Sequence, residues 1–136
     1  MNAEEQRNRD PLTQSVIGAF YEMSSELGYG FLEAVYRRAL VIALVDRGHR
    51  ACAESAIPVT FRGQPVGDYR ADILVDGCLL VEVKVGAGLV AAHRAQMLNY
   101  LRATDVEVGL LVNFGQRLTF ERLVFANERK RGPAPD

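Results

Sequence analysis

The chain has 136 residues, a length typical of one compact domain, and 49% of them are hydrophobic, which is enough for a sizeable core. Its net charge of −1 excludes a uniformly basic nucleic-acid-binding protein, so binding to DNA or RNA would need a local basic patch. Two cysteines are too few for a disulfide framework or a four-thiolate metal site. The polar N-terminus and the lack of a long apolar segment predict a cytoplasmic protein without membrane association.

The first half of the chain begins with a polar segment, residues 1–9, which is predicted to be a flexible leader. Asp10 and Pro11 are typical of a helix start, and apolar residues then recur at helical spacing as far as Leu27. After a glycine-containing break, a second helix is predicted over residues 31–48.

The second half of the chain changes to strand periodicity. Strands are predicted over residues 55–63, 66–75 and 78–85, followed by a helix over 91–104 and two further strands over 106–114 and 117–125. The strand 106–114 is very apolar and is therefore expected in the interior of a sheet. Residues 126–136 are predicted to be a flexible tail, which leaves a single domain over residues 10–125. The order ααβββαββ indicates an α/β or α+β sheet with helices packed on it.

Two charged residues, Glu82 and Lys84, lie inside the apolar strand 78–85. A buried charge is costly unless it is paired or bound to a metal. Because the two residues are two positions apart, their side chains point to one face of the strand, where Asp72 from the preceding strand could join them. Two carboxylates suit a magnesium ion, and a neighbouring lysine can orient water and stabilise charge on a phosphate. A cross-strand ion pair at a sheet edge would explain the same pattern.

The turn between the second and third strands decides whether the two carboxylates can meet. A two-residue turn would place Glu82 on the opposite face from Asp72. A three-residue loop over Val75–Gly77 pairs Asp72 with Leu80 and makes Glu82 its diagonal neighbour on the same face. We therefore predict such a loop, or a bulge of the same parity, with positive φ at Gly77.

Three motifs carry a resemblance to known proteins. Asp72, Glu82 and Lys84 resemble the core of the PD-(D/E)xK nuclease superfamily, although the proline of its label is absent. Gln96 and Tyr100 resemble the Q-x-x-x-Y helix motif of the RecB-type exonuclease branch, and "GFLEAVY" at 30–36 matches the motif of the bacterial GxxExxY family. The resemblance spans roughly residues 12–125 and implies a restriction-endonuclease-like α/β core with a mixed central sheet flanked by helices.

The same resemblance implies a nuclease that uses Mg²⁺ or Mn²⁺ to hydrolyse phosphodiester bonds of nucleic acid, with DNA as the expected substrate. Asp72 and Glu82 would be the main metal ligands together with the backbone carbonyl of Val83, and Glu33 would reach the metal from the second helix. Lys84 would position the attacking water. Glu33 could instead form only an exposed helix pair with the arginine four residues later.

The predicted helix 91–104 would contribute Gln96, Tyr100 and His93, and Tyr36 would come from the second helix. Gln96 and Tyr100 lie on one helical face and would contact the substrate phosphate or support Lys84. His93 and Tyr36 are candidate substrate contacts, but His93 could be an ordinary solvated helix residue and Tyr36 a core aromatic with its hydroxyl bonded.

Two further expectations concern cofactors and partners. The iron–sulfur relatives of the RecB-type branch need four cysteines, so no cluster is expected here. The alternative function is a catalytically inactive nuclease-fold module that binds nucleic acid or a protein partner. Because the domain is small and weakly charged, a homodimer or a protein partner could help it to hold nucleic acid.

Overall fold

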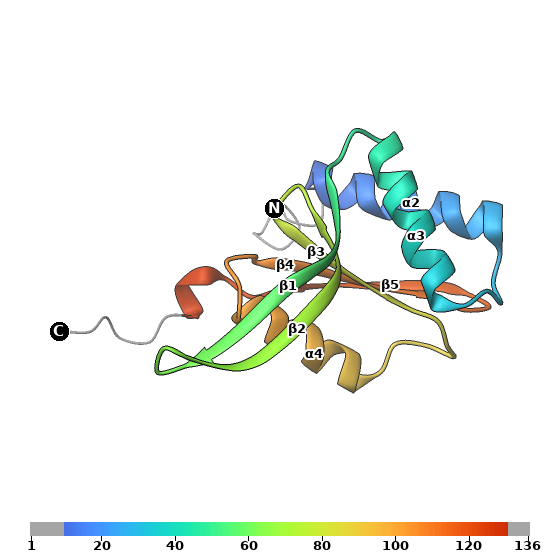
Figure 1. Cartoon of the computed structure of the whole chain (residues 1–136). Coiled ribbons are helices and arrows are strands. Elements are labelled where there is room, and N and C mark those ends of the chain that lie inside the picture. The colour runs from blue at the N-terminus through green and yellow to red at the C-terminus, as the bar shows by residue number, and fades with distance from the viewer. Residues whose placement is uncertain (1–9, 131–136) are drawn as a thin grey trace, which may run out of the picture.

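The computed structural model describes residues 10–130, which form one mixed sheet with helices on both faces (Figure 1). The predicted order ααβββαββ is confirmed. The helices are α2 (Pro11–Leu27), α3 (Glu33–Asp46) and α4 (Ala91–Arg102), and a short 3-10 helix, η1 (Asn127–Arg129), follows the last strand. The strands are β1 (Ala51–Phe61), β2 (Gln64–Val75), β3 (Leu79–Lys84), β4 (Val108–Phe114) and β5 (Leu118–Val124).

The five strands lie in the order β1-β2-β3-β4-β5. Only β3 and β4 are parallel, and the remaining neighbours are antiparallel, so the predicted mixed sheet is confirmed. The apolar strand β4 has a neighbour on each side, as expected of an interior strand. Helix α4 forms the crossover between the two parallel strands, because such a pair cannot be joined by a tight turn.

Two apolar clusters hold the helices to the sheet. The larger cluster lies under α2 and α3 and includes Val81 and Val83 of β3, and the smaller one lies under α4 and includes Leu80. Alternate residues of β3 therefore enter opposite layers, as the period of a strand requires. Glu82 and Lys84 share the parity of Leu80, which directs them toward α4.

The start of β1 differs from the prediction. The strand begins at Ala51, four residues earlier than expected, because residues 51–53 pair with 73–75 of β2. Its first residues, "ACAE", have little intrinsic preference for a strand, so the partner strand determines their conformation. Helix α3, at Glu33–Asp46, is also shorter than the predicted range of 31–48.

The ordered domain extends beyond the predicted boundary at residue 125. Lys130 Nζ donates hydrogen bonds to the carbonyl oxygens of Thr104 (3.0 Å) and Val106 (2.6 Å) and to Asn127 Oδ1 (2.6 Å). These bonds place Lys130 and Asn127 beside the segment that follows α4, and the flexibility of the tail stays a prediction. The predicted leader, residues 1–9, and the rest of the tail, 131–136, lie outside the described residues. Over residues 10–130, no helix is both long and apolar enough to cross a membrane.

Candidate functional site

The loop between β2 and β3 is formed by Asp76–Cys78, one residue later than predicted. Asp76 leaves the ladder because it is bonded to the start of β1: its Oδ1 accepts the N–H of Arg50 (2.8 Å) and its own N–H donates to the Arg50 carbonyl (2.9 Å). Gly77 has a φ of 71°, so the predicted positive φ is confirmed. This φ suits a residue without a Cβ atom.

Because the loop lies one residue later than predicted, each residue of β2 pairs two positions further along β3. A shift of two positions leaves every side chain on the face that was predicted. Ile73 pairs with Val81, which places Asp72 opposite Glu82 rather than opposite Leu80. The predicted pairing was therefore wrong by two residues. Since directly opposed residues share a side of the ladder, the expectation that the two carboxylates meet is confirmed.

The two carboxylates continue the β2–β3 pairing where the backbone ladder ends. The N–H of Asp72 donates to Glu82 Oε1 (2.8 Å), and the N–H of Val83 donates to Asp72 Oδ2 (2.7 Å). The N–H and C=O of one strand residue point to the same side, so the Val83 carbonyl is directed toward β2 beside these carboxylates. Two carboxylates and one carbonyl are thereby brought to the end of the β2–β3 ladder.

The neighbouring β1–β2 ladder is distorted at the same position. Glu54, the residue opposite Asp72, has a φ of 54°, which is unfavourable for a residue with a side chain. Ile73 packs in the cluster under α2 and α3, whereas Ala71 packs with Ile57 in the cluster under α4. Residues two apart in a regular strand share a face. The side chains of β2 therefore change from one face of the sheet to the other at Asp72, and we call this change the turnover of β2. The remainder of the β1–β2 hairpin therefore faces α4.

Lys84 completes the constellation from the end of β3. Its Nζ lies 3.9 Å from Glu82 Oε2 and donates to Gln96 Oε1 on α4 at 3.2 Å. The Lys84 side chain is 21% exposed, whereas that of Glu82 is 5% exposed, so the ammonium lies between the buried carboxylate and solvent. The bond to Gln96 agrees with support for Lys84, one of the two roles that the helix motif implied, and both roles stay predictions.

Burial dominates the electrostatics of the two carboxylates. Burial and, after it, the negative charge of Asp72 raise the pKa of Glu82 to about 7, against the hydrogen bond from the Asp72 N–H and the charge of Lys84. Burial also raises the pKa of Asp72, against the hydrogen bond from Val83 and the positive charge of Arg37. Two buried carboxylates that resist ionisation together are a favourable place for a cation.

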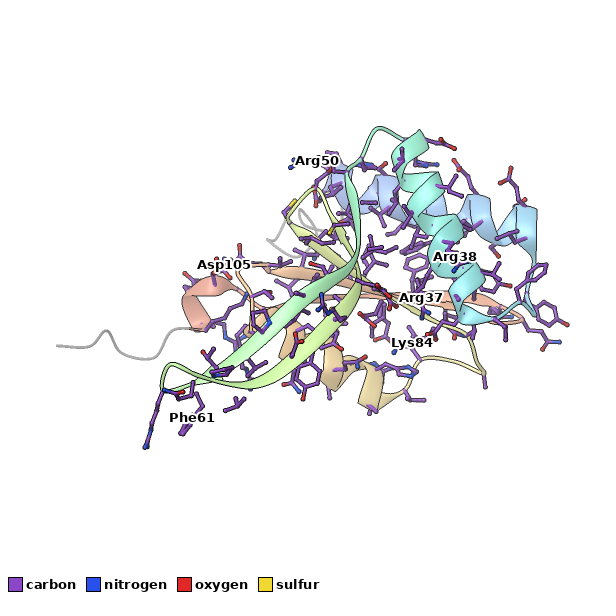
Figure 2. All side chains as sticks on the ribbon, viewed as in Figure 1. Arg37, Arg38, Arg50, Phe61, Lys84 and Asp105 are labelled. Carbon is purple, nitrogen blue, oxygen red and sulfur yellow. The ribbon has the colours of Figure 1, made fainter. Side chains whose placement is uncertain are left out.

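Arg37 links the third predicted carboxylate to this pair. It donates to Glu33 Oε2 at 2.6 Å, and the same nitrogen lies 4.0 Å from Asp72 Oδ1. The positive charges of Arg37 and Lys84, whose side chains are labelled in Figure 2, both act on Asp72. Glu33 thus makes the helix pair that was its alternative explanation, and its role as a metal ligand stays a prediction.

A family model described as the PD-(D/E)XK nuclease superfamily matches residues 10–123, which is most of the chain. The chain belongs to this superfamily. The crystal structure of SSO0001 is similar, with a TM-score of 0.56 and 21% sequence identity. The match covers 90% of this chain but only 62% of SSO0001, and at this identity it supports the fold alone. A comparison with curated proteins gives no match.

In this superfamily member, oxygen ligands available for a hard cation come from two carboxylates and one backbone carbonyl. Within residues 10–130, no three His, Cys, Asp or Glu side chains converge as a metal-binding group. The fit to Mg²⁺ or Mn²⁺ therefore rests on Asp72, Glu82 and the Val83 carbonyl, with water as the remaining ligands. This composition suits magnesium, which is usually held by one or two carboxylates and keeps several waters.

Helix α4 carries further residues that were predicted for the site. Tyr100 is 6% exposed, and its pKa is raised by burial and by the charges of Glu82 and Asp72. His93 Nδ1 accepts the N–H of Val90 (3.2 Å) at the start of the helix. Burial, followed by the charge of Lys84, lowers the pKa of His93. A substrate contact by His93 stays a prediction.

Tyr36 lies in the core rather than at the site. It is 0% exposed, and its ring stacks on Phe114 with a centroid separation of 4.8 Å. Its hydroxyl donates to the carbonyl of Gly28 (2.7 Å) and accepts the N–H of Phe31 (3.4 Å). These bonds fix the turn between α2 and α3, so the structure supports the core alternative and not a substrate contact.

A second polar cluster lies beyond the C-terminal end of α3. Ser15 Oγ is 2.7 Å from His49 Nε2, and His49 Nδ1 is 2.7 Å from Asp76 Oδ2. The order of the three groups is that of a serine hydrolase triad. However, Ser15 lies inside α2, where backbone N–H groups are bonded within the helix and cannot serve as an oxyanion hole. The cluster therefore joins α2, the connection between α3 and β1, and the β2–β3 loop.

The sequence carried no signal for the turnover of β2 or for the position of Tyr69. The turnover of β2 at Asp72 depends on the conformation of Glu54, and glutamate gives no signal for positive φ. It also brings Tyr69 to the face of α4, 6.0 Å from the ring of Tyr100. The position of Arg37 had a partial signal, since it follows Glu33 by four residues on one helical face.

Proposed function

We propose that this chain is a nuclease that uses Mg²⁺ or Mn²⁺ to hydrolyse phosphodiester bonds of DNA. The observation that carries the proposal is the convergence of Asp72, Glu82 and Lys84 at one end of the β2–β3 ladder, with each carboxylate bonded to the partner strand. Membership of a nuclease superfamily agrees with this chemistry. A cytoplasmic location and a homodimer or protein partner stay predictions from the sequence.

The cation would be held by Asp72 and Glu82 with the Val83 carbonyl. When bound, such a cation polarises a phosphate oxygen and lowers the pKa of water. The hydrogen bonds from the Asp72 and Val83 N–H groups occupy one oxygen of each carboxylate, Glu82 Oε1 and Asp72 Oδ2. The second oxygen of each group, Glu82 Oε2 and Asp72 Oδ1, is the one that remains for a ligand.

Lys84 would orient the water that attacks phosphorus, while the bond from phosphorus to the leaving oxygen breaks. Its ammonium has three donors, of which one is used by Gln96, so others can reach water and a phosphate oxygen. Gln96 is accordingly a positioning residue for Lys84. Arg37, 4.0 Å from Asp72, adds a second positive charge where negative charge develops on the phosphate.

The proposal is tested by incubating labelled single- and double-stranded DNA and RNA with the protein and Mg²⁺, Mn²⁺ or EDTA. We expect the wild type to cleave DNA only with a metal, and Glu82→Gln to be slower by roughly 100- to 1000-fold. Glu22→Gln is the matched control, since Glu22 lies on the outer surface of α2, and its activity should equal that of the wild type.

Two results would count against the nuclease. Equal cleavage by wild type and Glu82→Gln would remove the carboxylate from the mechanism. Absence of cleavage by the wild type with either metal would favour the alternative, a nuclease-fold module that binds nucleic acid or a protein partner without cutting.

A further inference from the structure

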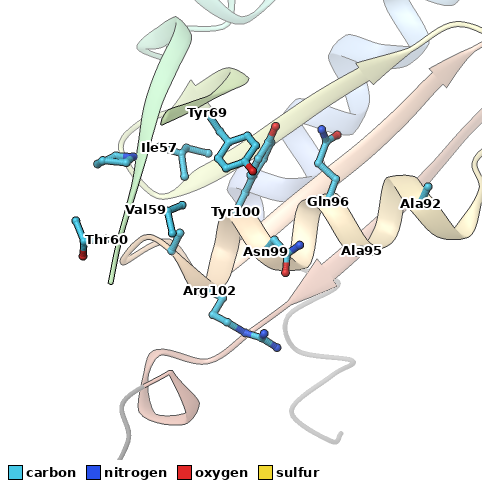
Figure 3. Close-up of a pocket in the computed structure, with 12 residues that line it drawn as sticks. Ile57, Val59, Thr60, Tyr69, Ala92, Ala95, Gln96, Asn99, Tyr100 and Arg102 are labelled. Carbon is cyan, nitrogen blue, oxygen red and sulfur yellow. The ribbon is translucent and has the colours of Figure 1, made fainter. Parts of the chain in front are cut away.

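A groove lies beside the candidate site, between the β1–β2 hairpin and α4 (Figure 3). Its volume is about 790 Å³, within the range of small-ligand sites. We propose that this groove binds an unpaired base of a single-stranded DNA substrate, next to the phosphate that is cleaved. This inference rests on the proposed function and names the form of nucleic acid that the site takes.

The groove and the site share two residues of α4. Gln96 and Tyr100 both line the groove, and Gln96 also holds Lys84 by the 3.2 Å hydrogen bond. Gln96 and Tyr100 are four positions apart, which corresponds to about 6 Å along the helix. A DNA strand whose phosphate lies at Lys84 therefore has its adjacent nucleotide at the mouth of the groove.

An exposed aromatic ring stands in the wall of the groove. Tyr69 is 52% exposed, and its ring centroid lies 6.0 Å from that of Tyr100 at an angle of 48°. Figure 3 shows the two rings beside one another at the β2 side of the groove. The turnover of β2 at Asp72 produces this placement, because without it Tyr69 would point to the α2–α3 side. An exposed tyrosine ring is a surface on which a nucleic-acid base can stack.

Polar groups stand at the rim of the same groove. Asn99 and Arg102 are exposed on the next part of α4, while the remaining wall is largely apolar, with Ile57, Val59 and Ala95 among its residues. The asparagine amide can bond the edge of a base, and the guanidinium can pair with a phosphate. An apolar groove with a few polar groups at its rim matches a flat aromatic base attached to a charged backbone.

An unpaired strand fits these observations better than a duplex. Bases in a duplex are stacked on one another, so an aromatic platform can be used only by a base that is free to leave the stack. A duplex is held mainly by positive charge along its phosphates, and this chain has a net charge of −1. The choice of DNA over RNA follows the proposed function, and the matched RNA is one arm of the test.

Fluorescence anisotropy with labelled oligonucleotides in EDTA tests the proposal without cleavage. The wild type should bind single-stranded DNA more tightly than the matched duplex or the matched RNA. Tyr69→Ala should weaken binding to single-stranded DNA by roughly 10- to 100-fold, and Tyr69→Phe should restore it, since the ring and not the hydroxyl is required. Tyr21→Ala is the control, because Tyr21 is equally exposed, at 58%, but lies on α2.

A second probe separates stacking from loss of fold. An oligonucleotide with abasic sites should bind to the wild type as weakly as normal DNA binds to Tyr69→Ala. Equal binding of single-stranded and duplex DNA, tighter binding of RNA, or no effect of Tyr69→Ala would overturn the inference. The nuclease proposal has a separate readout: cleavage lost in Glu82→Gln with unchanged cleavage in Tyr69→Ala would sustain the nuclease and reject the base site.

Discussion

Replacement of Glu82 by glutamine should stabilise the metal-free protein at alkaline pH. The pKa of Glu82 is raised from 4.5 to about 7, so ionisation of this carboxylate is less favourable in the folded chain than in the unfolded one. The resulting penalty is absent below pH 4.5, increases as the pH rises toward 7, and is constant above that. At 1.36 kcal/mol per unit of pKa, its upper limit is about 3 kcal/mol. For a domain of this size, that corresponds to roughly 10 °C in Tm.

Thermal unfolding in EDTA at pH 5 and pH 8 measures this penalty. Glutamine keeps an oxygen that can accept the Asp72 N–H, so any loss of packing or hydrogen bonding is similar at both pH values. The difference in Tm between Glu82→Gln and wild type should therefore be more positive at pH 8 than at pH 5. Glu121→Gln should show no such increase, because the hydrogen bond with Arg94 lowers the pKa of Glu121, which is therefore ionised at both pH values. An equal difference for Glu82→Gln at both pH values would refute the reasoning.

Three further results are expected. Lys84→Arg should reduce the rate of DNA cleavage by roughly 100-fold although the charge is kept, because a planar guanidinium cannot replace a compact ammonium. A rate near that of the wild type would mean that Lys84 serves only to balance the negative charge of the carboxylates. The pKa of Asp76 is lowered, first by the hydrogen bond from the N–H of Arg50. Thermal unfolding should therefore show that Asp76→Asn loses more stability at pH 7 than at pH 3, and equal losses would contradict this. Gly109→Ala would place a Cβ atom too close to Met97 Sδ, so urea unfolding should show a loss of about 1–3 kcal/mol. Wild-type stability would contradict the packing of α4 on β4.

The elements of the fold were largely predictable because their periodicity is strong. The start of α2 followed from Asp10, whose side chain accepts the N–H of Leu12 (3.3 Å), and the inward positions of Val81 and Val83 followed from strand alternation. The extension of β1 to Ala51 was not predictable, since it depends on pairing with β2 and not on its own residues. Local sequence therefore determined where elements lie, and contacts between elements determined where they end.

The meeting of Asp72 and Glu82 was predictable, but the geometry of the candidate site was predictable only in part. Asp72 and Glu82 meet because of the parity of the hairpin, yet the exact register depends on the bonds of Asp76 to Arg50, residues 26 positions apart. The role of Tyr36 was open in the sequence, because an aromatic residue at helical spacing fits both a core and a site. The hydrogen bond from the Tyr36 hydroxyl to the Gly28 carbonyl supports the core role.

The most direct test of the central claim, that Asp72 and Glu82 hold a divalent cation, is titration calorimetry with Mn²⁺ at pH 7.5. The wild type should bind one or two ions per chain, and Asp72→Asn should lose most of this binding. Asp46→Asn is the matched control, since Asp46 is an exposed residue at the end of α3, and its binding should equal that of the wild type. Equal binding of Mn²⁺ by wild type and Asp72→Asn would contradict the metal site.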